Sequence, residues 1–134
     1  MMYRLCVLAF ILLSPTAIAE KYDCVNPMTQ AAMNTCAGEI AKKSDAELNA
    51  LYKQVEQRLE GEGEKKVRLV AAQRSWIAFR NAECRFMASG ANGGSIYLMV
   101  SNQCFDGLTK KRIEDFKAYL SCPAGDSPCP VPSN

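Results

Sequence analysis

The residues best suited to chemistry lie in residues 71–84, a stretch that contains the only tryptophan of the chain together with glutamine, arginine, glutamate and cysteine. Polar groups within an apolar helix stripe need partners when they are buried. Two arrangements are compatible with the stretch: an enclosed polar network and a binding hot spot on the surface. Read as a helix, the stretch places one mixed set of side chains on the same side: Val70, Gln73, Trp76, Ile77, Arg80 and Cys84.

The spacing favours the network, because polar side chains earlier in the chain can supply the partners that buried groups need. The alternative is a surface hot spot around Trp76 and Arg80, since tryptophan and arginine are enriched at the centres of interfaces. We expect the network to lock the segment onto the preceding helices. Its expected members are Asn34, Asp45, Glu47, Asn49, Gln73, Arg74, Trp76, Arg80 and Glu83.

Catalysis is restricted by the absence of histidine from the whole sequence. Without imidazole, the usual catalytic triads and most zinc hydrolases are excluded. Paired carboxylates could support glycoside hydrolysis, but their flanking sequences are typical of solvated helix faces, so we expect no enzymatic activity. The cysteine spacing includes no C-x-x-C pair, so we also expect no metal ion and no cofactor. The carboxylates considered are Glu39, Glu47, Glu83, Asp106 and Asp115.

The first 19 residues have the pattern of a secretory signal peptide. Arg4 provides the positive charge, residues 5–13 form an apolar run, and Ala17 and Ala19 form a small-x-small cleavage site. The run is shorter than the roughly 20 residues that a spanning helix needs, and no later stretch approaches that length. We therefore expect a periplasmic or secreted protein that begins at Glu20 and has no membrane span.

The charge of the chain is nearly balanced, with 16 basic and 14 acidic side chains, of which Arg4 leaves with the signal. Nucleic-acid binding depends on clustered basic charge, so we expect no nucleic-acid partner. The remaining length fits one domain. We expect a helical domain over residues 20–121 and an irregular, disulfide-held tail over residues 122–134.

The cysteines of the exported chain number six once Cys6 is removed, and an even number in an oxidising compartment indicates three disulfides. Six cysteines allow 15 pairings. We favour the pairing in which each bond joins neighbours across a short connection or a helix hairpin: Cys24–Cys36, Cys84–Cys104 and Cys122–Cys129.

Hydrophobic periodicity predicts an all-α fold, a small antiparallel bundle of three to four helices stapled by disulfides. Asn26 and Pro27 predict the first helix start, and Ser44 with Glu47 forms a capping-box pattern that predicts a second start or a bend. Gly107 predicts a possible break in the last helix. The expected helices cover residues 27–43, 44–60, 64–87 and 95–121, with a flexible glycine-rich loop over residues 89–95.

An ordered set of motifs from about Cys24 to Leu120 resembles the lysozyme-inhibitor LprI-like family of secreted bacterial proteins. The resemblance implies a helical, disulfide-bonded envelope protein whose motif residues are structural positions. The chain departs from the family at Asn81, where aspartate is usual, and at Gly107, where a better helix former is expected. The motifs are Met33-Asn34-x-Cys36, Ser44-Asp45-Ala46-Glu47-Leu48-Asn49-x-x-Tyr52, Ala72-Gln73-Arg74-x-Trp76-Ile77-x-Phe79-Arg80-Asn81-Ala82-Glu83-Cys84, Gly93-Gly94-Ser95 and Leu108-Thr109-x-x-Arg112.

The function that this resemblance implies is a non-enzymatic binding protein that inhibits a lysozyme by occluding its cleft. The alternative is an envelope structural or stress-related interaction module without a lysozyme target. We expect the partner to be a lysozyme or another envelope protein. Since a lysozyme cleft carries two carboxylates, the binding element should offer basic or hydrogen-bonding groups. The candidate binding loop consists of Arg85, Ser89, Asn92, Gly93, Gly94 and Ser95.

Overall fold

A computed structural model describes residues 23–123 and 128–132, and in these residues the chain forms helices and no strand. The all-α prediction is therefore confirmed. The expected signal peptide, residues 1–19, lies outside the described residues. The elements are α1 (Gln30–Arg58), α2 (Gly63–Met87), the short 3-10 helix η1 (Ser89–Ala91) and α3 (Tyr97–Leu120).

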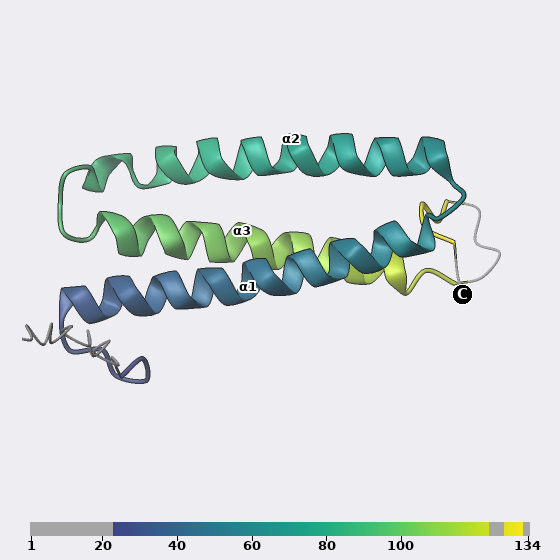
Figure 1. Ribbon diagram of the computed structural model, residues 1–134. Helices are drawn as coiled ribbons and strands as arrows, with labels where there is room; N and C mark the ends of the chain where they lie inside the picture. Colours follow the sequence, from purple (N-terminus) through teal and green to yellow (C-terminus); the bar gives the residue numbers. More distant parts are fainter. Residues whose placement is uncertain (1–22, 124–127, 133–134) are drawn as a thin grey trace, which may run out of the picture.

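The three long helices lie side by side in an elongated bundle (Figure 1). Because short connections reverse the chain twice, α2 is antiparallel to both neighbours, and α1 and α3 are parallel. Most of the interhelical contact is between α1 and α3, and α2 packs mainly on α3. The start of α1 and the α2–α3 connection thus lie at one end of the bundle, and the α1–α2 turn lies at the other. Gly61 allows that turn with a φ of 89°.

Helix α1 is one continuous helix, so of the two alternatives considered at Ser44, a second helix start or a bend, the second start does not occur. The Ser44 hydroxyl donates a hydrogen bond to the carbonyl of Ala41 at 3.0 Å, and Glu47 pairs with Lys117 of α3 at 3.2 Å. Both side chains of the expected capping box therefore have other partners. The helix begins later than predicted as well, because the Thr29 side chain accepts a hydrogen bond from the backbone N–H of Ala32.

Helix α3 is also continuous, and the break considered at Gly107 does not occur. The side chains of Asp106 and Lys110 form an ion pair at 2.8 Å across this position, and a Cβ atom at Gly107 would meet nothing within 4 Å. The helix therefore accommodates the glycine at a cost of about 1 kcal/mol relative to alanine.

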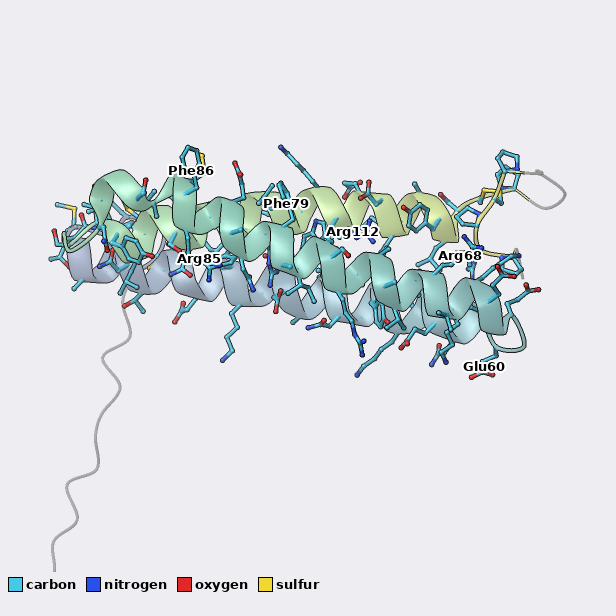
Figure 2. All side chains as sticks on the ribbon, turned by 90° about the horizontal axis from the view of Figure 1, so that it is seen from above. Glu60, Arg68, Phe79, Arg85, Phe86 and Arg112 are labelled. Carbon is cyan, nitrogen blue, oxygen red and sulfur yellow. A yellow bond between two sulfur atoms is a disulfide. The ribbon has the colours of Figure 1, made fainter. Side chains whose placement is uncertain are left out.

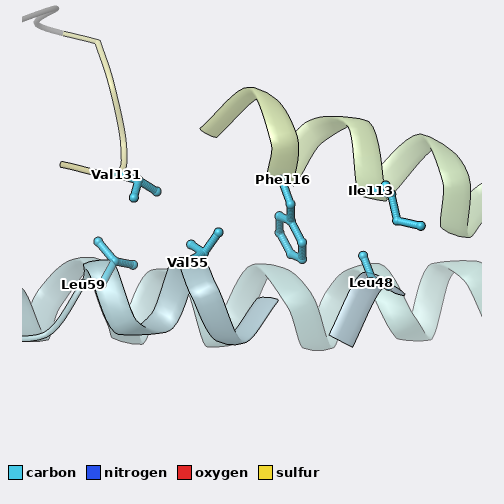
Figure 3. Close-up of a cluster of buried hydrophobic side chains, with 6 residues drawn as sticks. All are labelled: Leu48, Val55, Leu59, Ile113, Phe116 and Val131. Carbon is cyan, nitrogen blue, oxygen red and sulfur yellow. The ribbon is translucent and has the colours of Figure 1, made fainter. Parts of the chain in front are cut away.

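The hydrophobic core lies between α1 and α3 and is closed at one end by the C-terminal tail (Figure 3). Full burial of one large apolar side chain contributes roughly 1.5–3 kcal/mol to the stability of the fold. Val131 is only 2% exposed, so the tail is an integral part of the core. The buried residues of this cluster are Leu48, Val55, Leu59, Ile113, Phe116 and Val131.

Three disulfides staple the bundle, and the structure has the pairing that the sequence favoured. Cys24–Cys36 fastens the N-terminal segment to α1, Cys84–Cys104 joins α2 to α3, and Cys122–Cys129 closes the tail. In the chain-entropy model, a disulfide that closes a loop of this size stabilises the fold by on the order of 3 kcal/mol, because it restricts the unfolded chain. Three such bonds fit an oxidising compartment.

None of the helices over the described residues is long and apolar enough to cross a membrane.

Candidate functional site

The centre of the bundle holds a cluster of polar side chains around Arg80 of α2. Its Nη1 atom donates hydrogen bonds to Asp45 Oδ1 of α1 at 2.6 Å and to Thr109 Oγ1 of α3 at 2.9 Å. The guanidinium carbon lies 4.9 Å from the ring centroid of Trp76 and 5.4 Å from that of Phe105. Arg80 therefore connects all three helices through one side chain, which is 13% exposed.

A second arginine, Arg112 of α3, extends this cluster. Its Nε donates to the Gln73 side chain at 3.2 Å, and its Nη1 pairs with Asp115 at 3.2 Å. The guanidinium carbon lies 4.6 Å from the ring centroid of Phe116 and 6.0 Å from that of Trp76. Both guanidinium groups therefore lie near the Trp76 ring. We call this set the central polar cluster: Asp45, Gln73, Trp76, Arg80, Thr109, Arg112 and Asp115.

The structure brings together only part of the predicted network, namely Asp45, Gln73, Trp76 and Arg80. Asn34 lies near the start of α1, away from the cluster. Its side chain accepts a hydrogen bond from Gln30 and donates one to the Ser95 carbonyl. Glu47 pairs with Lys117. Among the described residues, the remaining three have no hydrogen-bond partner in the cluster: Asn49 and Arg74 are exposed, and Glu83 is half-buried.

The sequence interpretation missed Thr109 and Arg112 as members of the cluster. Both are almost completely enclosed, with residue exposures of 1% and 9%. An arginine on an amphipathic helix ordinarily faces solvent, so composition gave no reason to place Arg112 inside. The available signal was the motif Leu108-Thr109-x-x-Arg112, which keeps the hydroxyl and the guanidinium one helical turn apart.

The α2–α3 connection is a compact turn, in contrast to the flexible loop expected from its glycines. The Gly94 N–H donates to the Ala91 carbonyl at 2.9 Å, and Gly93 has a φ of 76°. The Asn34 side chain donates to the Ser95 carbonyl at 2.9 Å and so ties the turn to α1. These bonds satisfy the polar backbone and hold the turn in one shape.

Exposed apolar side chains gather around this turn. Phe86, which is 72% exposed, projects from one side of α2 near its end, and Arg85 lies on the other side of the helix in this view (Figure 2). Arg85 forms no ion pair within the described part of the chain, whereas Arg80 and Arg112 both do. Exposed apolar groups that gather in one place are characteristic of interaction sites. We call this surface the loop-end patch: Arg85, Phe86, Met87, Ile96, Leu98 and the turn of residues 89–95.

The carboxylates considered for catalysis are spread along the bundle. Asp106 pairs with Lys110, Asp115 with Arg112, and Glu47 with Lys117. Hydrogen bonds that Lys117 donates to Glu114 and Glu47 raise the pKa of Lys117, because they favour its charged form. No group of three or more cysteine, aspartate or glutamate side chains within the described ranges is arranged to hold a metal ion.

Comparison with known proteins gives the chain its family. Residues 23–116 match the family described as Lysozyme inhibitor LprI. An uncharacterized protein of Rhizobium meliloti (strain 1021) is 30% identical over 109 residues, which cover 73% of this chain and 78% of that protein. No solved structure matches the chain. The match over most of the helical bundle shows that this chain belongs to the LprI family of lysozyme inhibitors.

Proposed function

We propose that this protein is an exported, non-enzymatic binding protein that inhibits a lysozyme by placing the loop-end patch in the substrate cleft. The observation that carries the proposal is the concentration of exposed apolar side chains around a compact, hydrogen-bonded turn, next to an arginine that forms no ion pair with the residues that the structure describes. A preorganised turn loses little conformational freedom on binding, and this favours affinity. Membership of the family supports the choice of a lysozyme as the partner.

The chemistry of the patch complements a glycosidase cleft. Such a cleft holds two carboxyl groups that flank the scissile bond, and a cationic side chain is attracted to them. Arg85 supplies this charge at the edge of the turn. Phe86 and Leu98 supply apolar surface of the kind that anchors interfaces. Occlusion requires no chemical step by the inhibitor, which agrees with the absence of histidine.

A lysis assay tests the proposal. The purified, oxidised protein is titrated against c-type and g-type lysozymes, and the expected result is a dose-dependent loss of cell-wall lysis. Arg85→Glu and Phe86→Asp should each raise the half-inhibitory concentration at least about tenfold, as expected for a buried interface anchor. Lys66→Glu is the matched control, because it makes the same charge change near the far end of α2; it should change the value less than about twofold.

The outcomes test separately whether a lysozyme is the target and whether the loop-end patch is the binding surface. Undiminished lysis at a large molar excess of the parent protein would show that these lysozymes are not its targets. Inhibition that survives both patch substitutions, or that is lost equally with Lys66→Glu, would place the binding surface elsewhere on the bundle.

An envelope interaction module without a lysozyme target remains the second candidate, and one observation favours it. Helix α2 also exposes Val67, Ile77 and Phe79, which lie away from the turn and at different angles around the helix. The hot spot considered at Trp76 and Arg80 is enclosed in the central polar cluster, so such a partner would contact these exposed residues instead. Capture of one envelope protein that is lost with Phe79→Asp, and kept with Phe86→Asp, would favour this function.

A further inference from the structure

The end of the bundle opposite the loop-end patch contains a small pocket beneath the C-terminal tail. It has a volume of about 240 Å³ and lies between the end of α1, the start of α2 and the end of α3. Val131 of the tail forms part of its wall and is packed against the core (Figure 3). The lining is apolar apart from three cationic side chains, and its residues are Val55, Leu59, Lys65, Arg68, Leu69, Ala72, Arg112, Tyr119, Pro130 and Val131.

The charge of this pocket is one-sided, because no described lining residue is acidic. Lys65 and Arg68 do pair with glutamates, but these are exposed pairs along α2 at 3.2 and 2.6 Å. Exposed pairs of this kind are worth little, so both cations remain available to a ligand. Arg68 stands at this end of α2 in Figure 2, well away from Phe86.

The third cation of the lining, Arg112, belongs to the central polar cluster. Its side chain is 10% exposed and is held by Gln73 and Asp115. Because Asp115 balances the charge of Arg112, the attraction for an anion comes from Lys65 and Arg68, whose glutamate partners are exposed to solvent. Two exposed cations beside an apolar lining match a ligand with one anionic head and an apolar body.

We propose that the pocket binds a single-chain aliphatic carboxylate, a free fatty acid of medium length. The chain lies against Leu69, Ala72 and Pro130, the apolar lining residues that have accessible surface, and the carboxylate faces Lys65 and Arg68. At about 30 Å³ per water, the volume corresponds to roughly eight water-sized groups, which is enough for one short alkyl chain and too little for a two-chain lipid. The site is separate from the surface proposed to meet lysozyme.

Titration of the exported, oxidised and ¹⁵N-labelled protein with hexanoate, heptanoate and octanoate below their micelle concentrations tests the site. The backbone amide signals of Leu69, Ala72 and Val131 should shift together. Affinity should rise about fourfold for each added methylene until the pocket is full, from the usual gain on burying such a group. Octanol and octylammonium should bind at least about fivefold more weakly than octanoate, because they do not complement the cations.

Substitutions test where the carboxylate and the alkyl chain of the ligand bind. Combined Lys65→Gln and Arg68→Gln should raise the dissociation constant for octanoate about fivefold, whereas the neighbouring Lys66→Gln should change it less than about twofold. Ala72→Trp fills the pocket from an exposed position on α2 and should abolish binding. Circular dichroism melting curves establish that each variant is folded, so a loss of binding can be assigned to the pocket.

Several results would overturn the proposal. These are the absence of shifts at millimolar octanoate, equal binding of octanol and octanoate, or unchanged binding by the folded Ala72→Trp variant. Tighter binding of a short peptide that ends in leucine than of octanoate would assign the pocket to a protein C-terminus and refute the fatty-acid assignment. Lysozyme inhibition is measured separately and decides neither outcome.

Discussion

Replacing Arg80 with methionine should destabilise the bundle by about 3 kcal/mol, because this side chain holds α2 against both other helices. The loss includes about 1 kcal/mol for the hydrogen bond to the buried Thr109 hydroxyl, and about 1 kcal/mol for the contacts with the Trp76 and Phe105 rings. The ion pair with Asp45 adds only about 1 kcal/mol, since the Asp45 side chain is 44% exposed.

Asp45→Ala should therefore cost only about 1 kcal/mol, because Arg80 keeps its contacts with Thr109 and the two rings. A double-mutant cycle of the two substitutions should give a coupling energy of about 1 kcal/mol. Arg74→Met is the matched control: Arg74 is exposed on the same helix, and the change should stay within about 0.5 kcal/mol.

Urea unfolding of the oxidised protein, followed by Trp76 fluorescence and far-ultraviolet circular dichroism, measures these differences. A loss of 3 kcal/mol is a large part of the roughly 5–15 kcal/mol typical of a domain, and it should lower Tm by about 10–20 °C. The reasoning is wrong if Arg80→Met costs no more than Asp45→Ala, or if the coupling energy is zero.

Three further substitutions test single residues within the helices: two concern helix stability and one concerns a titrating side chain. Gly107→Ala should stabilise the protein by about 0.5–1 kcal/mol in urea unfolding, since the new Cβ meets nothing and α3 gains helix propensity. Ser44→Ala should be nearly neutral in the same assay, whereas loss of a true N-cap would cost about 0.5–2 kcal/mol. Burial, with a smaller effect of Glu56, raises the pKa of Tyr52, so this group stabilises the fold below its unfolded value of 10.0 and loses this effect as the pH rises through the folded value. Between pH 9 and 11, the urea midpoint should therefore fall less steeply with pH for Tyr52→Phe than for the parent protein, because the variant lacks this one titrating group.

The sequence was sufficient to predict the segments that glycines separate. The limits of α2 and α3 agree with prediction within a few residues, because Gly61, Gly63 and the residue 89–95 turn mark where the helices end and begin. The second helix start considered at Ser44 does not occur, because Ser44 and Glu47 have the residue types of a capping box but find partners elsewhere. Such competition depends on tertiary contacts, so local propensity does not reveal it.

The candidate sites were predictable in part for a similar reason. Trp76, Gln73 and Arg80 could be recognised as an anomaly within one helix stripe, and the structure buries Gln73 and partly buries the other two. Arg112 and Thr109 come from another helix, and their contact with this stripe depends on the register between α2 and α3. The exposure of Phe86 and Leu98 depends on where the bundle ends, which periodicity does not specify.

From Cys24 onward, the three disulfides each join one cysteine to the next along the chain. In a chain that emerges from its N-terminus into an oxidising compartment, each bond can therefore form as soon as its second cysteine appears, before any later thiol is available to compete. An oxidant that links thiols in their order of appearance would yield these same three bonds without any exchange between them.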